Sequence, residues 1–390
     1  MLIVFFASCK TQQPFTFNRG GAAQQFYYTT VPFEWVENKM IVPVEINGKT
    51  YRFIVDTGAS NLVSETLYKE FDMPLLHKVV LTDQSGIKDS TLIVNMNNIT
   101  LGNVLFRNIP AGVVNDSNAF LKCFGADGFI GSNMLRNSAV RFSLRDTTLT
   151  VTDNFLKLGL NPENSWGLKL SPGQSLPFIN IAMVNTNDSI GVTEDVLFDT
   201  GADSFYSICF RNFELFTPQN IFQQIAFSAG GNTFGLHGNS ADTLHYKLLL
   251  SLMLINNASL TNVVFTTNSG NNSAIGAKIL KYGDITLDYK HKFFNFEPFI
   301  DEGENVYEKT FPIEPTLENN KALVGFVWDE ALKEIVSVGD RILFIDDVDY
   351  RNIKPCEMIV KPSGLSQKEK VTLTIEKNDG IIQKVEIEKK

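Results

Sequence analysis

The feature that most constrains this chain is a four-residue motif that occurs twice. Asp-Thr-Gly-Ala begins at Asp56 and again at Asp199. In each copy an apolar run typical of a buried strand, residues 51–55 or 194–198, leads directly into the aspartate. An Asx-type turn after a strand would account for either copy alone. It does not account for the recurrence of the whole pattern.

Three further pairs of segments occur in the same order in both halves of the chain. They are a Leu-x-Asn-Val-x-Phe segment, an apolar-apolar-Gly segment and an alternating, strand-like segment. The pairs are 99–106 with 258–265, 128–135 with 273–280, and 140–144 with 285–289. Four matched segments in one order indicate duplication of one structural unit.

Within each unit the patterns predict short strands more than helices. Phe is abundant, and Val, Ile and Thr cluster in short runs, which favours strands. Asn47-Gly48 between two apolar runs is a strong hairpin signal. We predict hairpins from 40–46 with 50–55 and from 79–81 with 91–94, short helices at 64–71 and 132–136, and a connection between the units at 158–175.

The composition argues against several classes of function. The net charge is −9 with a pI near 5.1, and no basic run precedes residues 367–370, so we expect no nucleic-acid partner. No apolar run is long enough to cross a bilayer. The four histidines are scattered without ligand spacing to cysteine, so we expect no metal. The four cysteines contain no Cys-x-x-Cys pair, and we predict no required disulfide framework.

The first residues suggest an envelope location. A short apolar stretch ends in Ala-Ser before Cys9, which resembles the end of a bacterial lipoprotein signal peptide. We therefore expect residues 1–25 to be a signal-like segment and tether. Cys9 would be lipidated and would anchor the protein to a membrane, facing the periplasm or the exterior. The apolar part is short and no Lys or Arg precedes it, so either the start codon lies further upstream or the likeness is accidental.

The doubled motif resembles the aspartic proteases of the pepsin and retropepsin superfamily. In these enzymes a strand ending in Asp-Thr/Ser-Gly is followed by an apolar-apolar-Gly segment, and pepsin-like members carry both sets in one chain. The resemblance covers about residues 31–299. It implies a mainly β, bilobal acid-protease fold with lobes at 26–157 and 176–300, a monomeric active unit, a peptide or protein substrate and no cofactor.

The resemblance assigns the catalytic dyad to Asp56 and Asp199. Two carboxylates a few ångströms apart cannot both ionise easily, so they share a proton. One can then activate a water while the other polarises the scissile carbonyl. The resemblance also assigns supporting roles to the motif neighbours. Thr57 and Thr200 would hydrogen-bond across the interface between the lobes, and Gly58 and Gly201 allow the two loops to approach closely. The residues that would brace the loops from behind are Ile130, Gly131, Ile275 and Gly276.

Alanine follows the glycine of each motif, at Ala59 and Ala202. Pepsin-like enzymes usually have Ser or Thr there, whose hydroxyl donates to the catalytic carboxylate. Without donors to the charged form, the pKa values of the dyad should rise. We therefore expect activity at weakly acidic to neutral pH.

The flap that closes over substrate departs from the pepsin pattern, because residues 83–88 contain no tyrosine. A second glycine-bearing segment, 228–233, occupies the corresponding place in the other unit. Two such tips suggest retropepsin-like double flaps that grip an extended peptide, although both could be ordinary surface turns. The candidate flap residues are Ser85, Gly86, Gly230 and Gly231.

Residues 308–390 resemble a PDZ domain, a small β-rich α+β unit. A Gly-Asp-x-Ile-x-x-Ile-like core at 339–345 follows a segment that contains Gly325-Phe326. In that family the loop before Gly-Phe binds a peptide C-terminus through backbone N–H groups. The resemblance assigns that role to Val324, Gly325 and Phe326, and a purely structural or docking role stays open.

Three functional hypotheses remain open. The first is an anchored aspartic endopeptidase whose PDZ domain recruits peptides. The second is a non-catalytic peptide-binding or scaffold protein on a retired protease fold, although scaffolding alone does not need two acids. The third is a self-processing or partner-specific protease.

Overall fold

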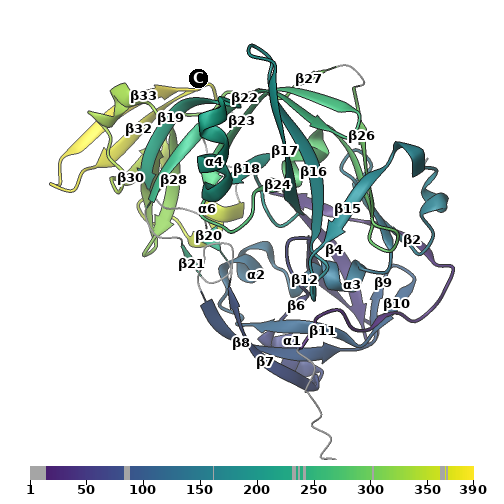
Figure 1. Ribbon diagram of the computed structural model, residues 1–390. Helices are drawn as coiled ribbons and strands as arrows, with labels where there is room; N and C mark the ends of the chain where they lie inside the picture. The colour runs from purple at the N-terminus through teal and green to yellow at the C-terminus, as the bar shows by residue number, and fades with distance from the viewer. Residues whose placement is uncertain are drawn as a thin grey trace, which may run out of the picture.

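The structure is a computed structural model that describes residues 15–82, 88–160, 162–230, 234–235, 238–239, 243–300, 303–360, 365 and 368–390. The described chain is mainly β and forms three large sheets (Figure 1). No helix in these residues is long and apolar enough to cross a membrane.

The first sheet contains the first copy of the motif, at the end of β5. Successive side chains point to opposite sides of a sheet, and the strands at the centre of this one are largely buried on both sides. Its strand order is β1 (Gly21–Ala22), β10 (Val104–Arg107), β9 (Ile99–Leu101), β4 (Lys39–Ile46), β5 (Lys49–Asp56), β12 (Gly128–Gly131), β6 (Leu62–Ser64), β11 (Ile109–Val114), β8 (Lys88–Met96) and β7 (Leu75–Thr82), with β3 (Glu34–Val36) paired to β4.

The second sheet contains the second copy, at the end of β17. Its order is β19 (Gln223–Gly230), β22 (Thr243–Ile255), β23 (Ala258–Asn268), β18 (Tyr206–Cys209), β24 (Ala274–Gly276), β17 (Ile190–Asp199), β16 (Pro177–Asn185), β15 (Trp166–Leu170), β26 (Phe293–Pro298), β25 (Gly283–Asp288), β13 (Ala139–Ser143), β14 (Thr148–Thr152) and β2 (Tyr28–Pro32), with β27 (Glu304–Asn305) paired to β23. A separate short pair joins β20 (Phe234–Gly235) and β21 (Gly238–Asn239).

The pairing around the two motifs repeats. β12 runs parallel to β5 with Gly131 opposite Asp56, and β24 runs parallel to β17 with Gly276 opposite Asp199. β13 pairs antiparallel with β25, so strands that follow the two apolar-apolar-Gly segments lie side by side. One large apolar core contains residues from both motif-bearing sheets.

A third sheet lies after residue 303 and has its own core. It appears in yellow-green beside β19 in Figure 1. Its order is β28 (Ile313–Glu318), β29 (Lys321–Val327), β30 (Arg341–Ile345), β32 (Lys370–Glu376) and β33 (Ile382–Glu388), with β31 (Val348–Asp349) paired to β30.

The described helices are short. Ser64 caps the first of them by accepting a hydrogen bond from the N–H of Leu67, as expected of serine at that position. The α-helices are α1 (Glu65–Glu70), α2 (Ala119–Phe124), α3 (Ser132–Leu135), α4 (Phe210–Phe216), α5 (Glu330–Lys333) and α6 (Pro355–Val360). The 3₁₀ turns are η1 (Phe155–Leu158), η2 (Pro162–Asn164), η3 (Thr217–Gln219) and η4 (Ala277–Lys281).

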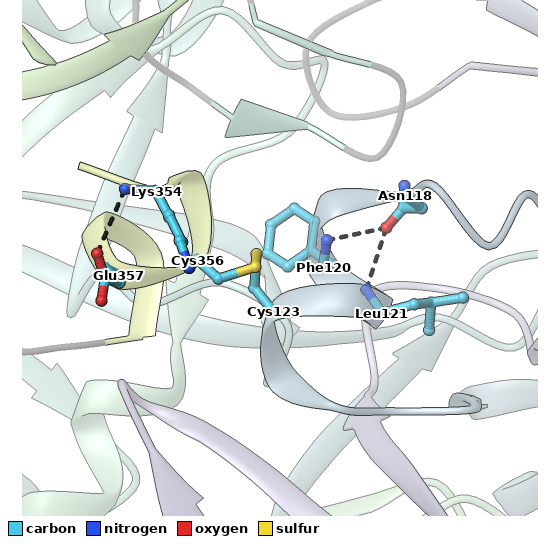
Figure 2. Close-up of a disulfide and its surroundings, with 7 residues drawn as sticks. All are labelled: Asn118, Phe120, Leu121, Cys123, Lys354, Cys356 and Glu357. Carbon is cyan, nitrogen blue, oxygen red and sulfur yellow. Dashed lines mark hydrogen bonds between the residues drawn. A yellow bond between two sulfur atoms is a disulfide. The ribbon is translucent and has the colours of Figure 1, made fainter. Parts of the chain in front are cut away.

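Two sequence-based expectations need correction. Residues 158–175 are more than a connection, since they contain β15, which pairs with both β16 and β26. The prediction of no disulfide framework is also wrong. Cys123 in α2 and Cys356 in α6 form a disulfide across 233 residues of sequence, with Cα atoms 4.6 Å apart (Figure 2). Cysteine spacing gave no signal for it, because the two residues meet only through the fold.

Candidate active site

Asp56 and Asp199 lie at the ends of β5 and β17 and face one another. Each strand is held in place by a buried parallel neighbour, β12 or β24. The two carboxyl groups are close enough that each affects the pKa of the other. Residues 143 positions apart are thereby brought into one site.

The two threonines of the motifs link the loops reciprocally. The N–H of Thr57 donates to Oγ1 of Thr200 at 3.0 Å, and the N–H of Thr200 donates to Oγ1 of Thr57 at 3.0 Å. Each hydroxyl in turn donates to a backbone carbonyl of the opposite strand: Thr57 to Phe198 at 2.6 Å and Thr200 to Val55 at 2.8 Å. Both threonines are fully buried, and these four bonds fix the spacing of the loops.

The motif glycines lie directly against the opposite aspartate. A Cβ on Gly58 would stand 2.3 Å from Cγ of Asp199, and a Cβ on Gly201 would stand 2.5 Å from Cγ of Asp56. Real Cβ atoms do not approach so closely, so the carboxyl groups occupy the space that any side chain here would need. The close pairing of the acids therefore depends on glycine at both positions.

The apolar-apolar-Gly segments pass behind the two loops. Ile130 and Ile275 have no exposed surface. A Cβ on Gly131 would collide with the backbone of residues 59–61, and one on Gly276 with the backbone of residues 202–204. The N–H of Ser132 donates to the carbonyl of Ala59 at 3.0 Å. The N–H of Ala277 donates to the carbonyl of Ala202 at 2.9 Å.

Both carboxyl groups titrate above their ordinary range. Burial raises the pKa of Asp56, and the neighbouring charge of Asp199 raises it further. Burial also raises the pKa of Asp199. Two groups oppose this rise: the ammonium of Lys39, and the N–H of Gly201, which donates to Oδ1 of Asp199 at 2.8 Å. The pair therefore holds one proton over a range of pH, and its apparent pKa values belong to the two groups together. Burial is the leading cause of this rise, whereas the sequence argument rested on the missing hydroxyls at Ala59 and Ala202.

Lys39 is a site residue that the sequence analysis missed. It is the first residue of β4, after a tight turn in which Glu37 and Asn38 both have positive φ. Its side chain is buried, and its Nζ donates to the carbonyl oxygen of Gly201. The ammonium group lowers the pKa of both Asp56 and Asp199. A sequence pattern that could have indicated Lys39 is a lysine at the start of a mainly apolar strand, β4, which pairs with the strand that ends at Asp56.

Tyr289 was also missed. Its hydroxyl lies 2.9 Å from Oγ of Ser132, which donates to the carbonyl of Thr57 at 2.7 Å. Burial raises the pKa of this tyrosine, so it stays neutral and can act as a hydrogen-bond partner. The contact connects the end of β25 to the loop of Asp56.

Of the expected flap residues, only Gly230 can be placed. Ser85, Gly86 and Gly231, like Cys9, lie outside the described residues. Gly230 ends β19 opposite Thr243. A Cβ on it would stand 2.2 Å from the carbonyl oxygen of Gly325, so this end of the hairpin packs against the third sheet.

Val324, Gly325 and Phe326, which the PDZ resemblance places at a carboxylate-binding loop, lie in a strand and not in a loop. All three lie within β29, with Val324 opposite Pro315 and Phe326 opposite Glu314. The N–H of Val324 already donates to the carbonyl of Asp340 at 2.8 Å. The sequence analysis misread an internal strand as a strand entered from a binding loop.

A family model described as "Aspartyl protease" matches residues 42–134, a range that contains Asp56 and Gly131 but not Asp199. No curated protein matches the sequence.

The solved structures that resemble this chain include two seed globulins. Conglutin gamma from lupine is 12% identical, with 70% of this chain and 95% of that chain covered and a TM-score of 0.41. Basic 7S globulin from soybean is 11% identical over the same shares, with a TM-score of 0.39. A retropepsin-like aspartic protease from Rickettsia conorii is 14% identical, covering 33% of this chain and 91% of that one, with a TM-score of 0.24. These scores are too low to carry an argument. Residues 42–134, which hold Asp56 and its bracing segment, are therefore the part of the chain that matches the aspartyl protease family.

Proposed function

We propose that this chain is an aspartic endopeptidase with a bilobal acid-protease fold, in which residues 26–157 and 176–300 form the lobes. One observation carries the proposal: two Asp-Thr-Gly loops face each other, with reciprocal threonine bonds and a glycine against each opposite carboxyl. A scaffold needs no such pair of half-buried acids, since placing two carboxyl groups together costs stability unless they share a proton.

The chemistry follows from the shared proton. The ionised member of the dyad takes a proton from a water held between the carboxyls, and the resulting hydroxide adds to the scissile carbonyl carbon. The protonated member donates to the carbonyl oxygen, so the tetrahedral intermediate is neutral. One acid of the dyad then protonates the amide nitrogen, while a hydroxyl of the intermediate gives its proton to the other acid. The C–N bond breaks, a carboxylic acid and an amine are released, and the dyad is left again with one shared proton. The threonine bonds hold both acids in place throughout.

The proposal also covers the third sheet and the N-terminal segment. We propose that residues 308–390 are a PDZ-like unit with a structural or docking role, which the contacts of β29 with β19 support. We also propose a cell-envelope location with an anchor at Cys9. The Cys123–Cys356 disulfide supports an oxidising compartment.

The direct test is cleavage of a library of unstructured peptides by the wild type and by Asp56→Asn. Asp203→Asn is the matched control, because Asp203 is an exposed acid just beyond the second motif. We expect Asp56→Asn to lower kcat/KM by at least about 1,000-fold, on the scale of losing an essential proton-transfer group. Asp203→Asn should stay within about twofold, as a surface change does. Inhibition by a peptide that carries a secondary hydroxyl in place of the scissile amide should accompany activity. Equal cleavage by all three proteins would refute the dyad, and no cleavage by any would favour the scaffold.

A further inference from the structure

Three buried residues form a chain of hydrogen bonds that ends at the loop of Asp56. The hydroxyl of Ser132 donates to the carbonyl of Thr57 at 2.7 Å. That bond uses the single proton of the serine, so in the contact of 2.9 Å between Oγ of Ser132 and the hydroxyl of Tyr289 the tyrosine is the donor. All three residues are buried, where a hydrogen bond is stronger than in water. The chain therefore runs from Tyr289 through Ser132 into the backbone of the first motif.

The carbonyl at the end of this chain belongs to the peptide bond between Thr57 and Gly58. The N–H on the other side of the same peptide bond is that of Gly58. Burial raises the pKa of Asp56, and the N–H of Gly58 is one of the groups that lower it. A peptide bond is conjugated, and hydrogen bonds in series polarise one another. Donation to the carbonyl therefore makes the N–H a stronger partner for the charged carboxyl.

The chain crosses from one half of the molecule to the other. Tyr289 directly follows β25 in the second half, whereas Ser132 begins α3 and Thr57 directly follows β5, both in the first half. The N–H of Tyr289 donates to the carbonyl of Ser138 at 3.1 Å, and β25 itself pairs with β13. The sheet that joins the two halves therefore sets the position of the tyrosine.

The second motif has no counterpart of this chain. The duplicated segments place Ala277 where the first half has Ser132, and Leu144 where the second half has Tyr289. Neither of these replacements carries a hydroxyl group. The strands and loops around the two acids are repeated, but the chain of hydroxyl groups reaches only the loop of Asp56.

We propose that Tyr289 and Ser132 are positioning residues, which hold a peptide bond of the first motif so that its N–H stabilises the charged form of Asp56. The inference rests on the proposed function, because this carboxyl takes part in a reaction only if the dyad cleaves peptides. The other ionisable groups that act on the same carboxyl are Asp199 from β17 and Lys39 from β4. The substitutions below leave both of them in place.

The test compares the pH profiles of peptide cleavage by the wild type, Tyr289→Phe, Ser132→Ala and the control Tyr27→Phe. Tyr27 is buried, and its hydroxyl lies 2.7 Å from Oγ of Ser138. The control therefore loses the same kind of tyrosine–serine hydrogen bond, at a pair that lies outside the chain. A role in stability alone would affect Tyr289→Phe and Tyr27→Phe alike.

Loss of the chain should move the pH profile of kcat/KM to higher pH, because weaker donation to the charged carboxyl raises the apparent pKa values of the dyad. We expect kcat of Tyr289→Phe and of Ser132→Ala to fall about tenfold, less than the roughly 100-fold that a displacement of about 1 Å costs. KM should stay within about twofold, and the double variant should lose no more than the larger single loss. Tyr27→Phe should keep the wild-type profile. A Tyr289→Phe profile that coincides with the wild type, or an equal shift in Tyr27→Phe, would overturn the proposal.

A second readout does not need activity. Titration of the aspartate carboxyl carbons by NMR reports the apparent pKa values of the dyad, with the Asp56 signal identified by its loss in Asp56→Asn. These values should rise in Tyr289→Phe and stay unchanged in Tyr27→Phe. An unchanged titration in a folded Tyr289→Phe protein would overturn the positioning role whatever the peptidase assay shows. A wild type that cleaves no peptide would instead refute the proposed function, and the titration would still decide the role of the tyrosine.

Discussion

At the residue scale, the dyad consists of two half-buried carboxyl groups beside one buried lysine, Lys39. Burial raises the pKa of both Asp56 and Asp199, and the charge of Asp199 raises the pKa of Asp56 further, while Lys39 from β4 lowers the pKa of both. Tyr289 also interacts with Asp56 but stays neutral. Because the hydroxyl donors that usually follow the motif glycines are replaced by Ala59 and Ala202, the lysine is the main external group that opposes the rise in pKa.

Lys39→Met should therefore shift the pH profile of activity upward. A cation lowers the pKa of a nearby carboxyl, so its removal raises both apparent pKa values of the dyad. The acidic limb of kcat/KM, where the pair becomes doubly protonated, then moves to higher pH, and so does the basic limb, where it loses its shared proton. Lys39→Arg, which keeps the charge, serves as the control. A Lys39→Met profile that coincides with the wild type would show that the lysine has no influence on the dyad.

Gly201→Ala should abolish most activity without unfolding the protein. The added Cβ would displace the carboxyl of Asp56, and a displacement of about 1 Å costs roughly 100-fold in rate. Gly167→Ala is the control, since a Cβ there meets nothing within 4 Å. Steady-state kinetics and circular dichroism on both variants check the prediction. Activity near the wild-type value in Gly201→Ala would mean that the loops are looser than described.

At the scale of elements, local sequence patterns predicted some turns and helices correctly but did not predict how all strands pair. The Asn47-Gly48 hairpin is confirmed, because Asn47 and Gly48 both have positive φ between β4 and β5, as a two-residue hairpin turn demands. The helix predicted at 64–71 is confirmed as α1. Residues of β29 were predicted to be a binding loop because the pairing partner, β28, is hard to recognise as a strand. Its sequence, 313–318, contains a proline and little apolar alternation.

Thr57→Val should destabilise the protein through the paired loops. The substitution removes the acceptor for the N–H of Thr200 and the donor to the carbonyl of Phe198. Each buried group left without a partner costs about 1–3 kcal/mol. Urea unfolding should show this loss, and Thr57→Ser, which keeps the hydroxyl, should recover most of it. A Thr57→Val protein as stable as Thr57→Ser would show that the cross-bonds contribute little.

At the scale of the whole molecule, the two halves are joined by shared strands as well as by the site. β13 from the first half pairs with β25 from the second. Arg141 on β13 donates to Oδ2 of Asp284 at 2.8 Å and forms an ion pair with Oε2 of Glu297 at 3.1 Å. The duplication in the sequence indicated two related units. It did not indicate this junction or the disulfide to α6, because such contacts depend on how distant segments meet.

Arg141→Met should destabilise the junction by about 3 kcal/mol, because it leaves the largely buried Asp284 carboxyl without its cation. Lys169→Met is the matched control. It removes an exposed ion pair with Asp195 and should cost less than about 1 kcal/mol. Urea unfolding of both variants measures the difference. Equal losses would show that the junction does not depend on this pair.

The central claim is that Asp199 belongs to the same catalytic site as Asp56, and Asp199 lies outside the segment that matches the aspartyl protease family. The most direct measurement is kcat/KM of Asp199→Asn for a cleaved peptide, taken beside the wild type and Asp203→Asn. We expect a loss of at least about 1,000-fold in Asp199→Asn, with the folded state retained and Asp203→Asn unaffected. Wild-type activity in a folded Asp199→Asn protein would contradict it.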